Sequence, residues 1–425
     1  MSVRIGFAGL THLGLISSLA AAERGYAVVA FDPDESVTSA VRRRVLPVDE
    51  PGLPALFAKH AESVTFADRA ESLSACDVVY IARDTPTNEA GGSDVSSIRA
   101  LVDLVIPALR RDAVLMVLSQ VPPGFTRSVP WPPAQCFCQV ETLIFGRAVA
   151  RALEPERIIL GCADPVAALP PALEQYLRAF GCPVLPMRYE SAELAKISVN
   201  MCLVASVSVA NTLAELCEQI GADWRDIVPA LRLDKRIGQH AYLTPGLGIS
   251  GGNLERDLAT VCHLADAHGT DAGIVRAWTV NSAHRRDWAM AMVHDRVISR
   301  VSEPTLAILG LSYKEHTAST RNSPSLALLA ALHPFPIRIY DPVVRPSREF
   351  HPRLVGAPSA LDTCTDADAL VIMTPWPEFG DLRPADIAAR LRGRTVIDPH
   401  GMLDARACRA EGLEHVVLGA SDVAQ

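Results

Sequence analysis

Residues 3–32 read VRIGFAGLTHLGLISSLAAAERGYAVVAFD, and this stretch decides the expected fold. An apolar run at 3–8 leads into a turn between two glycines, then into a helical pattern at 15–24 and a second apolar run at 27–31. Short apolar runs that alternate with helical stretches are typical of βαβ units in a parallel sheet. The stretch therefore predicts a strand, a turn, a helix and a second strand, in that order.

The turn has the context of a dinucleotide-binding site, because Gly9 can form the tight turn and Gly14 lets the helix approach the sheet. The amino end of the helix offers N–H groups and a positive dipole end to a pyrophosphate. Asp32 is placed to accept hydrogen bonds from an adenosine ribose and to repel a 2′-phosphate, which favours NAD over NADP. The expected NAD contacts are Gly9, Thr11, His12, Leu13, Gly14 and Asp32.

The dinucleotide motif is incomplete, because Thr11 stands where a second glycine normally allows close approach of the backbone. On this motif alone, a plain strand–turn–helix unit without a ligand stays open. His12 by itself is equally compatible with an ordinary loop histidine.

The alternation of strand and helix extends along the chain. Further strands are expected at residues 77–82, 113–118, 157–160 and 183–185, and after Pro304 at 305–309, 337–340, 369–373 and 394–397. Residues 191–296 are helical instead, with one glycine-rich break at 245–252. The chain is therefore expected to be α/β, then helical, then α/β.

Composition narrows the class of protein. At roughly 150 residues per domain, 425 residues predict two or three domains. The 40 Lys and Arg against 48 Asp and Glu give a formal charge of -8, which argues against nucleic acid as a partner. Ten scattered cysteines and the absence of an export signal predict a cytoplasmic protein with reduced thiols. The uncharged run at 197–214 contains Ser, Asn and Thr, so we expect a helix buried in protein and no membrane span.

Eight further stretches match one family in order and spacing over nearly the whole chain, and with them the sequence resembles the UDP-glucose/GDP-mannose dehydrogenases. The stretches are EPGL at 50–53, TP at 85–86 with GSD at 92–94, VPPG at 121–124 with TR at 126–127, EPERIILG at 154–161, ELAK at 193–196 with Asn200, DKRIG at 234–238, PGLG at 245–248, and GLSYK at 310–314 with RNSP at 321–324. Each stretch is weak alone, whereas eight in register are specific.

The resemblance implies an α/β fold in which two Rossmann-like domains are joined by a central helical dimerisation region. Residues 1–190 would form the NAD-binding domain, 191–300 the helical region, and 301–425 the domain that holds the nucleotide of a sugar donor. The implied cofactor contacts include Thr85 and Pro86. Lys314 and Arg321 match cationic residues near the nucleotide diphosphate, with Lys314 counted among the cofactor contacts.

Family members typically oxidise the C6 alcohol of a nucleotide sugar twice, through a thiohemiacetal and a thioester on a cysteine. The resemblance makes Lys196 the ammonium that stabilises the oxyanion, Asn200 its hydrogen-bonding neighbour, and Asp257 the base that acts through a water. These roles make physical sense, because loss of a hydride needs a proton acceptor and a fixed cation stabilises negative oxygen. Without the resemblance, Lys196 reads as a snorkelling residue at the start of an apolar helix.

The sequence departs from the family at this chemistry. Asn253 stands where the nucleophilic cysteine belongs, and a carboxamide cannot become a thiolate. Gln120 replaces a threonine that helps to position the water. Glu141, which the family uses in thioester hydrolysis, is retained, but Phe145 replaces a second glutamate. Cys262, nine residues after Asn253, would need a different geometry to substitute.

We therefore expect an NAD-dependent oxidoreductase that converts an alcohol of a nucleotide sugar or related nucleoside into an aldehyde or ketone in one two-electron step. Epimerisation by transient oxidation, or an inactive homologue that binds nucleotide sugar, stays open. The expected substrate contacts are Gly248, Gly251, Arg321 and Arg236, the last reaching the substrate of a neighbouring subunit in a homodimer. No metal is expected, because the chain's histidines lack a convincing ligand set.

Overall fold

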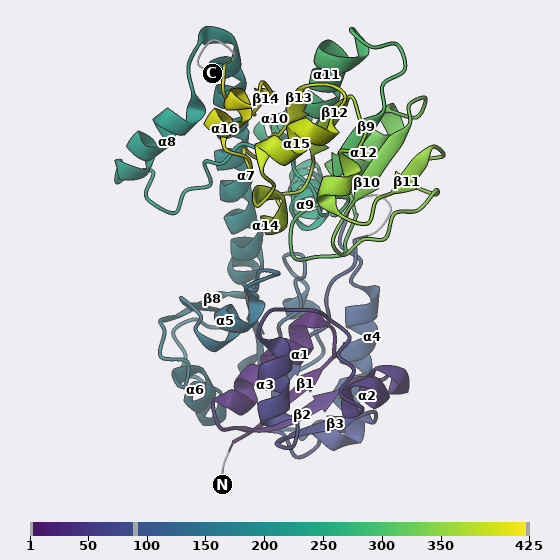
Figure 1. Cartoon of the computed structure of the whole chain (residues 1–425). Helices are drawn as coiled ribbons and strands as arrows, with labels where there is room; N and C mark the ends of the chain where they lie inside the picture. The colour runs from purple at the N-terminus through teal and green to yellow at the C-terminus, as the bar shows by residue number, and fades with distance from the viewer. Residues whose placement is uncertain (1–2, 88–91, 422–425) are drawn as a thin grey trace. The chain divides into compact units, whose positions relative to one another are not determined.

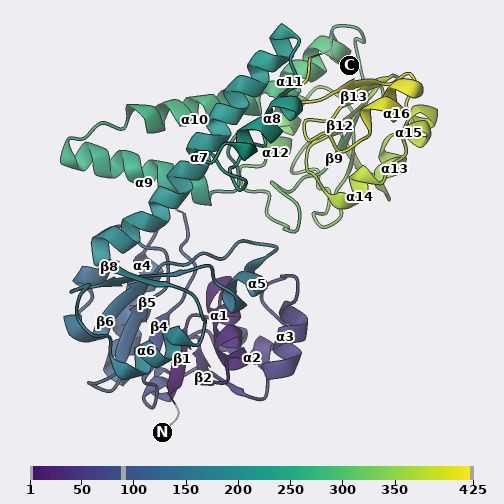
Figure 2. The ribbon, with the colours of Figure 1, turned by 90° about the vertical axis from the view of Figure 1, so that its left-hand side faces the viewer.

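The computed structural model describes residues 3–87 and 92–421. The chain divides into two compact units, Met1–Val199 and Asn200–Gln425, each of which contains one sheet (Figure 1, Figure 2). The boundary falls inside one long helix, α7 (Tyr189–Ile220). The three-part division at residues 190 and 300 therefore stays a prediction.

The N-terminal unit contains an eight-stranded sheet in the order β3-β2-β1-β4-β5-β6-β7-β8. Its strands are β1 (Arg4–Ala8), β2 (Ala27–Phe31), β3 (Val64–Ala67), β4 (Val78–Ile81), β5 (Val114–Val117), β6 (Cys136–Gln139), β7 (Ile158–Cys162) and β8 (Val184–Arg188). Its helices are α1 (His12–Glu23), α2 (Glu35–Arg42), α3 (Leu53–His60), α4 (Ser96–Val105), α5 (Ala148–Leu153) and α6 (Pro171–Arg178), with short 3-10 helices η1 (Ala70–Leu73), η2 (Ile106–Ala108), η3 (Thr126–Ser128) and η4 (Pro133–Gln135). The strand order reverses between β1 and β4, which is where open α/β sheets bind ligands.

The C-terminal unit continues from α7 into a helical layer and a six-stranded parallel sheet in the order β11-β10-β9-β12-β13-β14. Its helices are α8 (Trp224–Leu233), α9 (Asn253–His268), α10 (Gly273–Arg286), α11 (Trp288–Val293), α12 (Pro324–Ala331), α13 (Ala360–Thr363), α14 (Pro377–Gly380), α15 (Pro384–Arg390) and α16 (Ala405–Ala410), with a π-helix η5 (His294–Ile298). Its strands are β9 (Leu306–Leu309), β10 (Ile337–Tyr340), β11 (Leu354–Gly356), β12 (Ala369–Ile372), β13 (Thr395–Ile397) and β14 (Glu414–Val416).

The two sheets repeat one local arrangement after their first strand. Gly9 and Gly310 both have a φ of 98°. The N–H of the next residue then donates to a carboxylate after the neighbouring strand, from Leu10 to Asp32 and from Leu311 to Asp341, over 2.7 Å in each case. The expected α/β class with two Rossmann-like sheets is therefore confirmed.

Some local expectations are wrong. The strands β3, β6, β11 and β14 are not predicted, because each has only three or four residues and no clear apolar run. The sheet is not wholly parallel, because β6 pairs with β7 in the antiparallel sense. The first helix begins three residues earlier than expected, at His12, so that Gly14 lies inside it.

The expectation of a buried helix at 197–214 is only half right. Figure 2 shows α9 and α10 beside α7, and Asn281 of α10 donates to Thr212 of α7 over 3.1 Å. Val204 and Ala210 are buried, whereas Val209 and Leu213 are exposed. Among the described helices, α7 alone is long and apolar enough to cross a membrane, and 39% of its most apolar window is buried.

Candidate functional site

The turn after β1 is shaped by its two glycines. The positive φ of Gly9 lies in the region that favours glycine, and a Cβ added there would lie 3.0 Å from the backbone N of Arg83. A Cβ on Gly14 would lie 1.7 Å from the carbonyl oxygen of Gly9, so only glycine lets α1 approach the turn this closely. Both expected glycine roles are therefore seen in the structure.

Thr11 has a structural role that its sequence position does not reveal. It is the N-cap residue of α1, yet its side chain does not cap the helix. Its Oγ1 instead accepts a hydrogen bond from the backbone N of Asp84 over 2.9 Å. The hydroxyl thus ties the turn to the segment after β4, and no side-chain cap competes with a phosphate for the first-turn N–H groups.

The carboxylates after β2 and β10 differ in the number of donors that they receive. Asp341 accepts from six described donors: the backbone N of Leu311, Ser312, Val343 and Val344, Ser312 Oγ and Trp376 Nε1. Asp32 accepts from three: the backbone N of Leu10 and Asp34, and Arg83 Nη2. Because a carboxylate has about four lone-pair sites, Asp32 retains capacity for a ribose hydroxyl. NAD therefore fits the N-terminal sheet.

His12 belongs to a buried cluster at the start of α1. Its Nε2 lies 3.1 Å from Glu50 Oε2, and its ring stacks on Phe145 with the centroids 4.1 Å apart. Glu50 also accepts from the backbone N of Gly146 over 3.1 Å and of Ala148 over 2.8 Å. Glu50 thus joins α1 to the segment after Glu141. It is the first residue of the EPGL stretch, but the sequence did not indicate this structural role.

The first turns of α7 are anchored to the segment at 121–136. Glu193 is buried and accepts from the backbone N of Gly124 over 2.6 Å and of Thr126 over 2.8 Å. Burial raises the pKa of the Glu193 carboxyl, and the two N–H donors oppose that rise. Tyr189 donates its hydroxyl to the carbonyl of Cys136 over 2.7 Å. The helix start is therefore fixed one turn before Lys196.

Lys196 faces Glu141. Its Nζ lies 3.2 Å from Glu141 Oε2, and both side chains are largely buried. A cavity of about 20 Å³ is lined by both residues together with Gln120, Cys138 and Glu193. Gln120 joins this group through its backbone as well, because Thr85 Oγ1 donates to its carbonyl over 2.6 Å. The structure thus brings together three expected catalytic residues, Lys196, Glu141 and Gln120.

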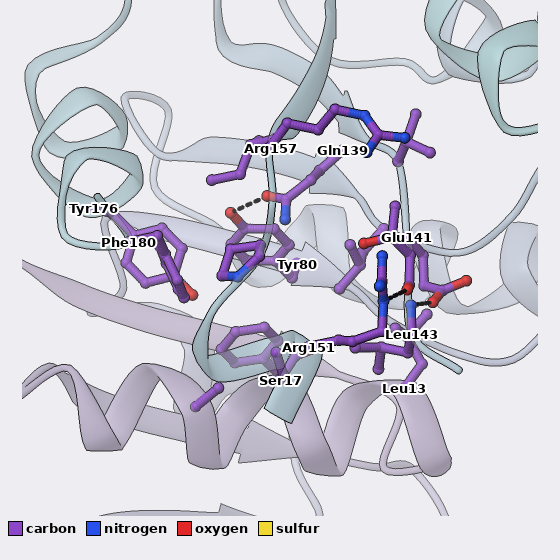
Figure 3. A pocket seen from close by; sticks show the side chains of 18 residues that line it. Leu13, Ser17, Tyr80, Gln139, Glu141, Leu143, Arg151, Arg157, Tyr176 and Phe180 are labelled. Atoms are coloured by element: carbon purple, nitrogen blue, oxygen red, sulfur yellow. Dashed lines mark hydrogen bonds between the residues drawn. The ribbon is translucent and has the colours of Figure 1, made fainter. Parts of the chain in front are cut away.

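Glu141 also lines a second cavity of about 60 Å³. Figure 3 shows Tyr176 and Phe180 at one end of it and Glu141 at the other, with Tyr80 between. Tyr80 donates to Gln139 Oε1 over 3.0 Å, and Leu143 donates its N–H to Glu141 (Figure 3). These contacts hold in place the backbone segment from which Glu141 reaches the Lys196 ammonium.

In the C-terminal unit, Asn200 and Asp257 are joined directly. Asn200 Nδ2 donates to Asp257 Oδ2 over 2.5 Å, and both side chains are buried. Arg256 Nε lies 3.7 Å from Asp257 Oδ1. Asn200 follows Lys196 by four residues of α7, which places the two on one side of the helix. The structure thus joins Asn200 to the expected base Asp257, whereas the sequence analysis makes Asn200 a hydrogen-bonding neighbour of Lys196.

Asn253 is the first residue of α9, and Gly252 is its N-cap. Close packing explains the glycines around it: a Cβ on Gly251 would lie 2.5 Å from the ring of Tyr313, and one on Gly252 would lie 3.0 Å from Arg321 Nε. A Cβ on Gly248 would lie 2.3 Å from the carbonyl of Ser282. The turn at 248–253 is thus packed against the segment that carries Lys314 and Arg321.

Some of the expected cofactor and substrate residues are exposed or lie beside residues outside the expected site. Arg236 is exposed and pairs with Asp234, with Nη2 2.6 Å from Oδ2. Pro86 is exposed as well, next to Thr85. Lys314 Nζ lies 5.8 Å from the ring centre of Tyr313. Among the described residues there is no cluster of three His, Cys, Asp or Glu side chains that could hold a metal ion.

Three parts of the chain match models of the UDP-glucose/GDP-mannose dehydrogenase family. The NAD binding domain matches residues 3–178, the central domain 190–283 and the UDP binding domain 307–405. The UDP-glucose 6-dehydrogenase TuaD of Bacillus subtilis is 27% identical over 432 residues, covering 98% of this chain and 93% of that protein. A UDP-glucose 6-dehydrogenase of Pseudomonas aeruginosa is 29% identical over 426 residues, covering 93% of each.

Two solved structures show the same fold over nearly the whole chain. The UDP-D-ManNAc dehydrogenase of Pyrococcus horikoshii has a TM-score of 0.85 at 24% identity and covers 98% of this chain and 99% of its own. The UDP-glucose dehydrogenase of Pyrobaculum islandicum has a TM-score of 0.83 at 23% identity, and the match covers 100% of this chain and 98% of that chain.

Proposed function

The chain belongs to the UDP-glucose/GDP-mannose dehydrogenase family, and from that premise we propose that it oxidises one alcohol of a nucleotide sugar, or of a related nucleoside, in a single two-electron step. The Gly9 turn and Asp32 would hold NAD, which would supply the acceptor for the hydride of the alcohol carbon. The hydroxyl loses its proton in the same oxidation, so the product is an aldehyde or ketone.

The described residues supply the two groups that this step requires. Lys196 steadies the negative oxygen, and Glu141 at 3.2 Å orients the ammonium. Asp257 takes the proton through a water, and the amide of Asn200 at 2.5 Å holds the carboxylate in position. Arg321 and Lys314 are the cations offered to the nucleotide diphosphate. Gly248 and Gly251 are the proposed substrate contacts in the turn before Asn253, which packs against Ser282 and Tyr313.

Asn253 carries the proposal of one oxidation rather than two. A second hydride must leave a tetrahedral carbon that bears an enzyme sulfur or a hydroxide, and a carboxamide supplies neither. Cys262 cannot take the place of the missing thiol, because nine residues of α9 separate it from Asn253 by about 13 Å along the helix axis.

Cys138 is the described cysteine that lines the cavity beside Lys196. Burial raises its pKa to about 12, so at neutral pH it is a thiol and not the thiolate that attacks a carbonyl. The chain therefore offers no activated sulfur at either of these positions. We also place the protein in the cytoplasm as a homodimer, in line with its ten free cysteines and the exposed apolar face of α7.

The test is the stoichiometry of the reaction. UDP-hexoses are incubated with NAD and the full chain, NADH is read by absorbance, and the product is trapped with a hydroxylamine reagent and weighed by mass spectrometry. We expect one NADH per substrate and a trapped carbonyl. Asn253→Cys is run beside the wild-type protein and should give the same ratio, because Gln120 and Phe145 also depart from the family's hydrolytic site.

Two NADH per substrate and a carboxylate from the wild-type protein contradict the proposal. In that case, Cys138→Ala separates a thiol mechanism, which the substitution abolishes, from oxidation of an aldehyde hydrate, which it leaves intact. An epimerised product without net NADH favours transient oxidation. Tight binding of nucleotide sugar without any turnover favours an inactive homologue.

A further inference from the structure

Arg83, two residues after β4, is built into the dinucleotide turn. Its backbone packs against Gly9, where a Cβ would lie 3.0 Å from the Arg83 N. Asp84 donates its N–H to Thr11 over 2.9 Å, and Ser119 Oγ donates to the Arg83 carbonyl over 2.6 Å. These three contacts fix the residue from which the guanidinium projects.

The Arg83 side chain reaches Asp32, the carboxylate expected to select the cofactor. Its Nη2 donates to Asp32 Oδ1 over 3.3 Å, across 51 residues of sequence. Arg83 Nε is buried and has no hydrogen-bond partner among the described residues. The side chain remains 26% exposed. A guanidinium carries five N–H donors, so with Nε buried and one Nη2 hydrogen donated to Asp32, the remaining Nη donors are left for a ligand.

The charges of Asp32 and Arg83 determine whether a ribose 2′-hydroxyl or a 2′-phosphate can bind beside them. An acidic residue at the end of the second strand binds the ribose 2′-hydroxyl of NAD and repels the 2′-phosphate of NADP, whereas a nearby arginine accommodates that phosphate. Here the two occur together and their own formal charges cancel, while Arg83 also attracts the exposed carboxylate of Asp34, the N-cap residue of α2. The planar fork of a guanidinium also binds phosphate oxygens in a bidentate manner.

We propose that Arg83 is a cofactor-specificity residue, which lets this protein bind NADP as well as NAD at the Asp32 carboxylate. The proposal rests on the placement of the dinucleotide at the Gly9 turn within the proposed function. It does not depend on the number of hydrides transferred or on the identity of the sugar.

The chain offers a matched control in Arg110. It pairs with Asp77 over 2.8 Å, directly before β4 and so at the opposite end of the strand that Arg83 follows. The pair has the same Arg–Asp chemistry in the same unit. Because it lies at the amino end of the strand, it is away from the edge at which parallel sheets bind ligands.

The experiment is calorimetric titration of the full chain with NAD and with NADP, without any sugar substrate. We expect the two dissociation constants of the wild-type protein to agree within about tenfold. Arg83→Met should raise the dissociation constant of NADP by at least about tenfold, which is the effect of losing a charge-assisted hydrogen bond. The dissociation constant of NAD should change by less than about threefold. Arg83→Lys should retain part of the NADP affinity. Arg110→Met should change neither constant.

Two results would overturn the proposal. One is NADP bound at least about a hundredfold more weakly than NAD by the wild-type protein. The other is an equal loss of both cofactors in Arg83→Met with an unchanged unfolding midpoint, which would make Arg83 a support of the turn alone. Binding of both cofactors without oxidation of any nucleotide sugar would instead defeat the proposed function and leave this proposal standing.

Discussion

Lys196 owes its position to two contacts of different kinds, and this predicts what its loss does. Its ammonium faces Glu141 at 3.2 Å, while Glu193, one helical turn earlier, holds the helix start. Lys196→Ala removes the cation and its pair with Glu141 but keeps the Glu193 contacts that hold the helix start. We therefore expect the rate of NADH formation to fall by at least about a hundredfold while the unfolding midpoint changes little.

The control for Lys196→Ala is Lys59→Ala, which removes an exposed Lys–Glu pair of 2.7 Å from the same unit. Initial rates of both variants are compared with the wild-type protein at saturating NAD. Equal rates for Lys196→Ala and the wild-type protein would show that the ammonium has only a structural role.

The start of helix α7 is held in place by the carboxylate of Glu193, which accepts two backbone hydrogen bonds. Glu193→Ala leaves the backbone N–H groups of Gly124 and Thr126 without their buried acceptor, at a cost of about 2–3 kcal/mol. We expect the unfolding midpoint to fall by roughly 5–10 °C, and by less in Glu193→Gln, whose amide oxygen still accepts one bond. Differential scanning calorimetry measures both.

The contribution of Glu193 to the stability of the folded protein should depend on pH. Burial raises the pKa of its carboxyl above the usual value of 4.5, so the folded state binds the proton more tightly than the unfolded state. The stability of the wild-type protein relative to Glu193→Gln should therefore decline as the pH rises from 4.5 through the folded-state pKa. A difference between the two proteins that does not vary with pH would show that the carboxyl is not perturbed.

At the scale of the whole molecule, the exposed side of α7 predicts a dimer. Val209, Leu213, Leu216 and Ile220 recur at helical spacing along one side, and all are exposed in the single chain. Such an apolar surface is unfavourable in water unless a partner covers it. Light scattering should give a dimer or a multiple of it at micromolar concentration.

Leu216→Glu tests the dimer surface by placing a charge at a position that is 50% exposed in the single chain. We expect dissociation or a clearly weaker dimer. Val166→Glu is the control, because Val166 is 91% exposed and lies between β7 and α6 rather than on α7. A wild-type monomer, or a Leu216→Glu protein as dimeric as the wild type, would contradict the assignment of this surface.

Features that depend on short-range pattern could be predicted from the amino-acid sequence. The run from β1 to β2, the glycines at 9 and 14 and the helical region after residue 190 follow from neighbouring residues, because apolar spacing and φ preference are local properties. The position of Asn253 follows from the family resemblance. The family's motifs also marked Lys196, Asn200 and Asp257 as chemically important. The strand β6 was not predicted because its residues, CFCQ, form no clear aliphatic run, whereas predicted strands of the same length do.

The contacts between residues far apart in the sequence are seen in the folded chain and were not predicted. Arg83 reaches Asp32, Lys196 reaches Glu141 across 55 residues, and Asn200 reaches Asp257 across 57. The tertiary structure also decided that Asp341 is saturated by six donors while Asp32 has capacity to spare, although both follow a strand in the same way. Strand order and loop packing set these contacts, and they depend on burial between segments that no local spacing encodes.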